Sequence, residues 1–476
     1  MKKQHVSLII LLSIFLNACD MIEYHPYDGR ISGERRVNEK NIKSIESICA
    51  EKRTIRFIWM GDSQRFYDET EDFVDNINER DDIDFVIHGG DVSDFGATKE
   101  FIWMRDIMNK LSVPYVVLLG NHDCLGNGED IFREIFGEVN FSFLAGNVKF
   151  ICLNTNALEF DYSRPVPDFA FMEKEYEDDR EEYEKTIFAM HVRPFSEQFN
   201  NNVAKVFQEF IQKFPDLQFC LNAHDHQFTA DNLFEDGVIY YGTPNVKKRQ
   251  YLVFTINADD TYDYELVDFK NILFVFTLIV LFPCPILGQS KYEDRIDKYR
   301  SRWKKLIPTH YKIQYAGGMG LISLGTGWDY GKNNQWETDV FLGFLPKYST
   351  KDNKLTFTLK QNFMPWRTNL GRGFSSELLS CGLYLNTVLN GDFWVSDPDK
   401  YPDGYYTFST RLRIYAYLGQ RLTYNIPKDK RFFAKAVTLF YEVSTNDLYV
   451  ISAAGNKYLK PDDYLKLSFG LKFQFF

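Results

Sequence analysis

The chain has 476 residues, with 55 Lys and Arg against 66 Asp and Glu, a net charge of −11 and 45% hydrophobic residues. These totals exclude a disordered polyanion, a collagen-like chain and a small disulfide-stapled domain, and the length predicts two or three domains. Residues 51–270 carry a net charge of −22 and residues 271–476 a net charge of +10. This asymmetry indicates two different kinds of domain on one chain.

Residues 1–19 have the pattern of an export signal, in which two lysines precede an apolar run from Val6 to Phe15. The run is too short to predict a membrane-spanning helix. Residues 16–19 resemble the lipobox of bacterial lipoproteins, which makes Cys19 the expected lipidation site. An ordinary secretory signal with an incidental cysteine is the alternative, and both readings predict export. Residues 20–53 are expected to form a linker.

Residues 54–268 alternate β-branched or aromatic runs with polar helical stretches, which predicts an α/β domain. Five of the apolar runs end in side chains that can bind metals, at the strand ends where α/β sheets usually build sites. His224 and His226 alternate on a segment expected to be extended, so they should point the same way. The polar blocks are Gly61-Asp62-Ser63-Gln64, Gly90-Asp91-Val92-Ser93-Asp94, Gly120-Asn121-His122-Asp123, His191 and His224-Asp225-His226.

Each block alone could be a turn or a helix cap, but their order resembles the D-x-H, G-D-x-x-D, G-N-H-D/E, H and G-H-x-H pattern of calcineurin-like metallophosphoesterases. The resemblance implies a four-layer α/β sandwich (αββα) over residues 54–268, with a site for two divalent metal ions. It implies that His122 acts as the acid on the leaving oxygen and that Asp94 orients the His122 ring. The implied ligands are Asp62, Gln64, Asp91 and His226 for one ion, and Asp91, Asn121, His191 and His224 for the other.

The chemistry of these residues agrees with that resemblance. Two cations about 3.5–4 Å apart can clamp both oxygens of an in-line phosphoryl displacement, and Asp91 is suited to bridge them. Mixed imidazole, carboxylate and amide ligands suit Mn, Fe or Zn.

Gln64 departs from the family pattern because it replaces a histidine and offers no imidazole nitrogen, so the ion that it contacts is expected to bind more weakly. A metal-binding pseudoenzyme, with the second half of the chain as its main functional part, is therefore the alternative to an active enzyme.

The charge of the first half bears on its substrate. A region carrying −22 repels long polyanions, so a small phosphomonoester or phosphodiester is expected rather than nucleic acid. Arg65 and Arg193 lie close in sequence to the expected ligands and are candidates for contacting a phosphate, although exposed, solvated arginines are an equally good interpretation.

A second apolar run, Ile272 to Phe282, follows Lys270 in the middle of the chain. Its length and basic flank resemble another signal peptide, so residues 269–290 are interpreted as the relic of a second gene start. A buried core helix and an inner-membrane anchor are the alternatives. The chain has 7 cysteines without CxxC pairs, which indicates neither a zinc ribbon nor a disulfide framework.

Residues 291–476 change to a period of two, which predicts an all-β antiparallel barrel with one lipid-facing and one polar face. About eight strands predict a small barrel filled by its own side chains. A soluble β-sandwich or barrel is the alternative. The expected strands are 311–325, 336–347, 353–364, 376–390, 405–417, 419–425, 434–443 and 465–476, with Trp328, Trp336, Trp366 and Trp394 as membrane-girdle candidates near their ends.

The last residues, 471–476, alternate and close on Phe476. This ending resembles outer-membrane barrels, whose last strand is read by the insertion machinery. The whole sequence therefore predicts a lipid-anchored metallophosphoesterase joined to a barrel in the outer membrane of a Gram-negative cell envelope. Its expected partners are a small phosphoester, the membrane and the insertion machinery.

Overall fold

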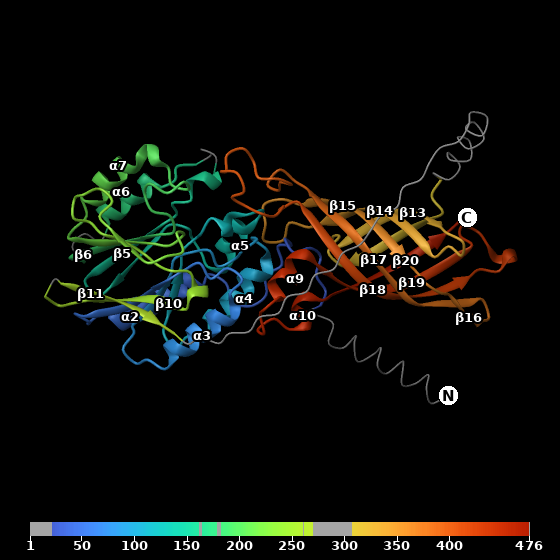
Figure 1. The fold of residues 1–476 in the computed structure, drawn as a ribbon, viewed down its shortest axis with the longest axis horizontal. Coiled ribbons are helices and arrows are strands. Elements are labelled where there is room, and N and C mark those ends of the chain that lie inside the picture. Colours follow the sequence, from blue (N-terminus) through green and yellow to red (C-terminus); the bar gives the residue numbers. More distant parts are fainter. Residues whose placement is uncertain (1–20, 161–163, 179–181, 260, 270–306, 476) are drawn as a thin grey trace.

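The structure is a computed structural model that describes residues 21–160, 164–178, 182–259, 261–269 and 307–475 (Figure 1). The expected signal at 1–19 with Cys19, the apolar run at 272–282 and Phe476 lie outside these residues. Within the described ranges, no helix is both long enough and apolar enough to cross a membrane.

The first half folds as two mixed β-sheets that pack face to face. One sheet has the order β11-β10-β1-β2-β3 and the other β4-β5-β6-β7-β9-β8. Strands β1, β2 and β3 run parallel to one another, as do β5, β6, β7 and β9. The strands are β1 (Ile55–Met60), β2 (Phe85–His88), β3 (Tyr115–Val117), β4 (Phe141–Ala145), β5 (Val148–Leu153), β6 (Lys185–Met190), β7 (Leu217–Asn222), β8 (Thr229–Asp231), β9 (Tyr240–Gly242), β10 (Gln250–Ile256) and β11 (Tyr262–Asp268).

Helices cover both outer faces of this sheet pair, which confirms the predicted four-layer sandwich. Phe57, Phe85 and Phe150 pack between the sheets, whose strands are apolar on both faces because both faces are buried. One helix group covers the first sheet with residues such as Phe101, and another covers the second with residues such as Phe207. The helices are α2 (Val37–Cys49), α3 (Tyr67–Asn78), α4 (Thr98–Met108), α5 (Gly128–Ile135), α6 (Phe169–Glu177) and α7 (Ala204–Ile211), with 3₁₀ turns at His122–Cys124, Ala157–Phe160, Asn201–Val203 and Val246–Lys248.

Part of the segment 20–53, which we expected to be a linker, is folded against the α/β domain. Helix α2 places Asn38 beside β3, where its side-chain amide donates to the Val117 carbonyl (2.8 Å) and accepts from the Val117 N–H (2.9 Å). The amide therefore satisfies backbone groups at the edge of the sheet.

The second half is a closed antiparallel barrel of eight strands, as predicted. The ring closes through β15 with β17 and through β20 with β12, while β16 extends from β17 as a hairpin outside the ring. Its elements are β12 (His310–Ala316), β13 (Ile322–Tyr330), β14 (Trp336–Leu345), β15 (Lys354–Phe363), β16 (Thr368–Gly371), β17 (Phe374–Leu389), β18 (Leu412–Asn425), β19 (Ala436–Asn446) and β20 (Lys466–Gln474), with α9 (Asp447–Ala453), α10 (Pro461–Tyr464) and a 3₁₀ turn at Lys428–Lys430.

Two predicted strand boundaries were wrong, and the errors cancel in the count. The predicted strand 311–325 is the hairpin of β12 and β13, because Gly317 and Gly320 adopt φ of 80° and 127° and reverse the chain. Residues 405–411 of the predicted strand 405–417 lie outside the strands, in the connection before β18. The remainder of that strand is joined to 419–425 in β18, whose register with β19 is continuous from Tyr415 to Asn425.

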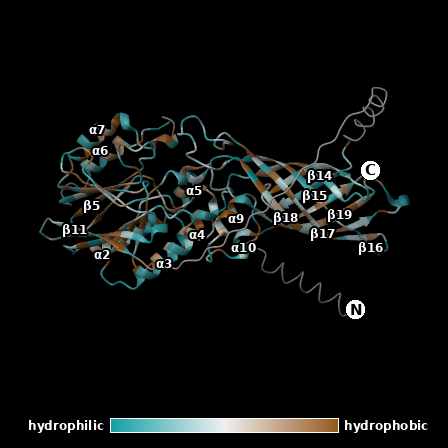
Figure 2. Cartoon of the chain, in the orientation of Figure 1, coloured by the Kyte–Doolittle hydropathy of each residue, from teal (hydrophilic) through white to brown (hydrophobic). Residues whose placement is uncertain are grey.

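The barrel interior is filled by paired polar side chains. Glu337 is completely buried and accepts hydrogen bonds from Lys312, Lys472 and the Arg421 guanidinium (2.9 Å for Arg421). The apolar residues of the same strands face outward, and Leu324 and Leu418 are each 61% exposed. Figure 2 shows hydrophobic residues along the barrel strands.

The two halves contact each other at one end of the barrel, where α9 and α10 lie beside α4 (Figure 1). The Trp103 indole donates to Asp463 of the barrel half (3.1 Å), and Asp68 accepts from the Tyr458 N–H (2.9 Å). Trp394, a predicted membrane-girdle residue, instead packs at this junction against Tyr406, with ring centroids 5.7 Å apart.

Candidate metal centre and active site

The predicted site residues follow strands of both sheets. The first three blocks come after β1, β2 and β3, and the two histidine blocks come after β6 and β7. A bridge from Gly61 to Asn245 and the packing of Gly61 against Ala223 bring the two sheet edges together. The Gly before the first histidine of the family pattern is Ala223 here, and its methyl group fits this contact.

Five of the predicted ligands have left-handed backbone conformations, which non-glycine residues rarely adopt and which cost about 1–3 kcal/mol each. Such strain is retained where the surrounding structure enforces it, and here the strained residues are all predicted metal ligands. The positive φ values also show that the expectation of an extended segment at His224 and His226 was wrong. The φ values are 53° for Asp62, 40° for Gln64, 57° for Asp91, 67° for His224 and 56° for His226.

One group of ligand atoms comes from Asp62, Asp91 and His226, whose potential ligand atoms all lie within 4.8 Å of one another. Asp62 Oδ1 is 3.4 Å from His226 Nε2 and is a buried oxygen without a hydrogen-bond donor within the described residues. A buried carboxylate oxygen left in this way fits a bound cation. Gln64 is buried beside this group and donates its main-chain N–H to the Asp91 carbonyl (2.8 Å).

A second group surrounds the side-chain oxygen of Asn121. Asn121 Oδ1 lies 3.1 Å from His191 Nε2 and 3.0 Å from His224 Nδ1, and His191 Nε2 lies 3.5 Å from Asp91 Oδ1. Adjacent ligands of an ion with bonds of about 2.1 Å are separated by about 3 Å, so this spacing fits a shared cation. Asp91 takes part in both groups, as expected of a bridging ligand.

The protonation of His224 and Asp62 suits metal binding, whereas burial and the adjacent Asp62 carboxylate have opposite effects on His226 and leave its pKa raised. His191 Nδ1 lies 2.8 Å from the Gly89 carbonyl, which orients the ring and leaves Nε2 toward Asn121. Burial, together with the nearby His191, lowers the pKa of His224 to about 4. Burial opposes ionisation of Asp62, but the adjacent His226 ring and the other nearby imidazoles give that carboxyl a lowered pKa. Neutral imidazoles and an ionised carboxylate are the forms that bind cations.

His122 lies at the edge of this centre, and Asp94 orients its ring through an unexpected atom. His122 Nδ1 is 2.7 Å from the Asp94 main-chain carbonyl, whereas the Asp94 carboxylate is 3.6 Å away and pairs with Arg65. Burial disfavours a charged ring, but the carboxylates of Asp91 and Asp94 raise the pKa of His122 to about 9. The ring is therefore a proton donor at neutral pH.

The two arginine candidates are both paired with carboxylates. Arg65 binds Asp94, and Arg193 Nε lies 2.6 Å from Asp225 Oδ2. The charges of both guanidinium groups are therefore already engaged by these two carboxylates.

Asp123 has a structural role that the sequence did not assign. Its buried carboxylate accepts from the N–H groups of Asp91 (3.0 Å), Ser93 (2.9 Å) and Gly120 (3.0 Å), which joins the loops after β2 and β3. Gly120 permits this approach, because a Cβ there would lie 2.1 Å from Asp91 Oδ1.

A residue of the barrel half also reaches the site and was missed entirely. Asn121 Nδ2 donates to the hydroxyl of Tyr406 (2.9 Å), and the Tyr406 ring lies edge-on to His122 with centroids 5.2 Å apart. Tyr406 lies 285 residues from Asn121 in a turn-rich loop without a motif, so no sequence pattern indicates the contact.

Comparison with known proteins identifies the first domain. Residues 55–228 match the family described as calcineurin-like phosphoesterase. The domain is therefore a calcineurin-like phosphoesterase domain, followed by a closed antiparallel barrel. Among curated proteins, the chain is 26% identical over 192 residues to the 3′,5′-cyclic-nucleotide phosphodiesterase alr5338 of Nostoc, covering 38% of this chain and 70% of that protein.

A second relative is the uncharacterized protein YvnB of Bacillus subtilis, 24% identical over 235 residues. That match covers 42% of this chain and only 18% of the relative. Among solved structures, the purple acid phosphatase PPD1 of yellow lupin matches with a TM-score of 0.32 and 13% identity, covering 45% of this chain and 54% of that chain.

Proposed function

We propose that this protein hydrolyses small phosphoric esters at a centre for two divalent ions and that its barrel lies in a bacterial outer membrane. The observation that carries the enzymatic part is the convergence of ligand atoms from five strand ends around Asp91. Asp62 with His226, and Asn121 with His191 and His224, form two groups that share this carboxylate.

The ions and the protein divide the chemistry between them. Bound divalent ions of this kind supply charge neutralisation and a water of lowered pKa. The protein holds their ligands at the strand ends, five of them in strained backbone conformations. It also holds the His122 ring against the Asp94 carbonyl, so that Nε2 is left to donate a proton to the leaving oxygen.

The substrate that we propose is a small phosphomonoester or phosphodiester. The net charge of −22 over residues 51–270 disfavours long polyanions. The similarity to a relative described as a cyclic-nucleotide phosphodiesterase adds small phosphodiesters to the first substrates to test. The metals that we propose are Mn, Fe or Zn, with the weaker site beside Gln64.

The outward face of the barrel supports the membrane part of the proposal. Leucines and phenylalanines of neighbouring strands form a continuous exposed surface, while ion pairs fill the interior. Trp336 and Trp366 are exposed at the end far from the phosphoesterase domain, where aromatic residues suit a membrane interface. A soluble barrel would place these two kinds of residue the other way round.

The test uses the full chain purified in detergent and stripped of metal. We expect hydrolysis of an aryl phosphate or a bis-aryl phosphate on adding Mn²⁺, Fe²⁺ or Zn²⁺, and loss of that hydrolysis in Asp91→Ala and His122→Ala. Binding of the ions without turnover of any ester, cyclic nucleotides included, would instead establish the pseudoenzyme. A barrel that stays monomeric in water without detergent would contradict the membrane location.

A further inference from the structure

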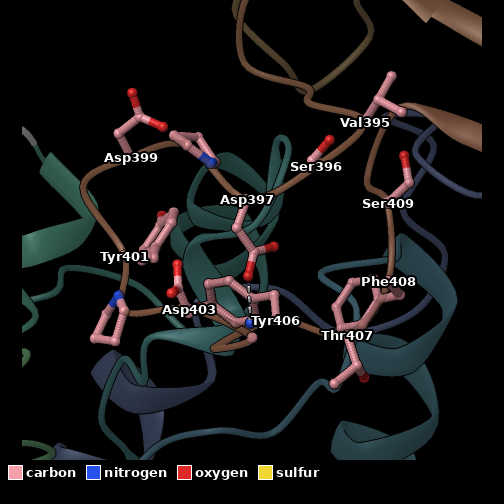
Figure 3. Close-up of a pocket in the computed structure, with 13 residues that line it drawn as sticks. Val395, Ser396, Asp397, Asp399, Tyr401, Asp403, Tyr406, Thr407, Phe408 and Ser409 are labelled. Carbon is pink, nitrogen blue, oxygen red and sulfur yellow. Dashed lines mark hydrogen bonds between the residues drawn. The ribbon is translucent and has the colours of Figure 1, made fainter.

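The loop that joins β17 to β18, residues 390–411, leaves the barrel and packs into the phosphoesterase domain. Its Phe408 ring meets Phe95 edge-on with centroids 4.7 Å apart, and the Tyr406 N–H donates to Asp397 (2.9 Å) within the loop. Figure 3 shows Tyr406 and Asp397 of this loop above the ribbon of the phosphoesterase domain. The loop is thus held on both sides of Tyr406.

We propose that Tyr406 is a positioning residue of the metal centre, which fixes the amide of Asn121 so that its oxygen faces the ions. The inference rests on the proposed two-ion function and deepens it, because the barrel then completes the phosphoesterase site.

The single hydrogen of the Tyr406 hydroxyl determines how the Asn121 amide is oriented. The hydroxyl of Tyr406 has one hydrogen, which it donates to Glu159 Oε1 at 2.9 Å. Its oxygen is then free only to accept, and the group that faces it is the Asn121 amide at 2.9 Å. The Asn121 nitrogen must therefore face Tyr406, which directs Oδ1 toward His191 and His224.

Glu159 is held in place to receive that hydrogen. Its carboxylate also accepts from the Tyr401 hydroxyl (2.6 Å) and from the Gln198 amide (2.7 Å). Tyr401 comes from the same barrel loop and Gln198 from the phosphoesterase domain, so both halves of the chain fix the acceptor. A reversed Asn121 amide would present N–H groups where a cation requires an oxygen.

The test compares Tyr406→Phe with Tyr415→Phe in the full chain. The control removes a buried hydroxyl of the barrel that has no hydrogen-bond partner among the described residues. Removing a group that orients a metal ligand typically weakens metal binding about 10–100-fold. We therefore expect Mn²⁺ binding to the metal-free protein, measured by electron paramagnetic resonance, to weaken by about tenfold or more in Tyr406→Phe. The value of kcat should fall while KM changes little, and Tyr415→Phe should match the wild type.

A second variant, Glu159→Gln, retains the Tyr406 hydroxyl but gives it a partner that can also donate. We expect intermediate weakening of Mn²⁺ binding, so the proposal remains testable if Tyr406→Phe misfolds. Wild-type Mn²⁺ affinity in a folded Tyr406→Phe protein overturns the inference. Mn²⁺ binding without hydrolysis in the wild type overturns the proposed function alone, because the effect of Tyr406 on Mn²⁺ binding is still measured.

The two ends of the barrel support a separate inference about orientation. At the phosphoesterase end the strands are joined by residues 317–321, 346–353, 390–411 and 447–465, and at the other end by 331–335, 364–373 and 426–435. Outer-membrane barrels have short turns in the periplasm and longer loops outside the cell. The geometry points to a phosphoesterase domain that faces the cell exterior, provided that the barrel lies in the outer membrane as proposed.

Cysteine labelling tests this orientation. Lys205→Cys lies on an exposed helix of the phosphoesterase domain, and Phe432→Cys lies in a fully exposed loop at the opposite barrel end. In intact Gram-negative cells producing the chain, a membrane-impermeant maleimide should label Lys205→Cys. Phe432→Cys should be labelled only after the cells are permeabilised. Labelling is counted in both cases above that of the parent chain. The reverse pattern overturns the orientation. A chain found entirely in the soluble fraction overturns the outer-membrane proposal itself.

Discussion

The two halves of this chain place polar and apolar residues in opposite ways. In the phosphoesterase domain, β2 (Phe-Val-Ile-His) is buried along its whole length between layers that are mostly apolar, and the predicted ligands follow the strand ends. In the barrel, β15 buries Lys354, Thr356 and Lys360 and exposes the leucines between them. The first arrangement suits water outside and the second suits lipid outside, so the two domains respond differently to the same kind of mutation.

The largest expected effect is a loss of hydrolysis that leaves the fold of the barrel unchanged. Asp91→Ala removes the carboxylate shared by both ligand groups, so we expect hydrolysis to fall by about a thousandfold or more, a loss of about 4 kcal/mol in transition-state stabilisation. The barrel should be unaffected, because Asp91 lies in the other half. Steady-state kinetics with an aryl phosphate measure the first effect, and heat-modifiable gel migration of the barrel measures the second. Residual activity near the wild-type level would refute the role of Asp91.

The second prediction addresses the barrel interior. Glu337→Ala leaves Lys312, Arg421 and Lys472 without their shared counter-charge in a buried space, and removing one partner of a buried pair typically costs about 3–5 kcal/mol. We expect a large fall in the unfolding temperature in detergent. Asp352→Asn also removes one negative charge, but at an exposed loop position, and serves as the control. If both variants unfold alike, the interior network does not stabilise the barrel.

The third prediction addresses the outer face of the barrel. Leu418→Arg puts a charge on a 61% exposed position in the middle of β18, and at a bilayer midplane such a change costs about 2–4 kcal/mol. Leu370→Arg, in the exposed hairpin strand β16, should cost much less. Unfolding in lipid vesicles, compared between the two variants, measures the difference. Equal tolerance of both changes would indicate that water rather than lipid surrounds the barrel.

The sequence predicted which candidate ligands come together, because they follow buried strands in an ordered series. Asp62, Asp91, Asn121, His191, His224 and His226 all lie in the two ligand groups. Their strained backbone was not predictable, since φ at His224 depends on how the loop after β7 meets the other sheet. The contact of Asp94 through its carbonyl was also hidden, because a sequence pattern identifies side chains and not the atoms that they offer.

In the barrel, the alternation of residues predicted the architecture but not every turn. The period of two continues from β12 into β13, so only the positive φ of the glycines between them reveals the hairpin. Tyr406 was beyond prediction for a different reason. Its contact with Asn121 depends on how two independently patterned domains dock, and neither pattern contains that information.

The smallest expected effect concerns Gln64, where this chain departs from the family pattern. Gln64→His supplies an imidazole beside Asp62 and His226, and a nitrogen ligand suits Mn, Fe or Zn better than an amide oxygen. We expect the weaker ion to bind about tenfold more tightly, a gain of about 1.4 kcal/mol, as measured by calorimetric titration with Mn²⁺. Gln212→His, at an exposed position after α7 and outside both ligand groups, is the control. Tighter binding accompanied by faster hydrolysis would show that the glutamine limits the enzyme. Tighter binding without faster hydrolysis would show that weak occupancy of the ion site beside Gln64 does not limit catalysis. A protein with both ion sites filled would then be no more active than one with that site partly filled.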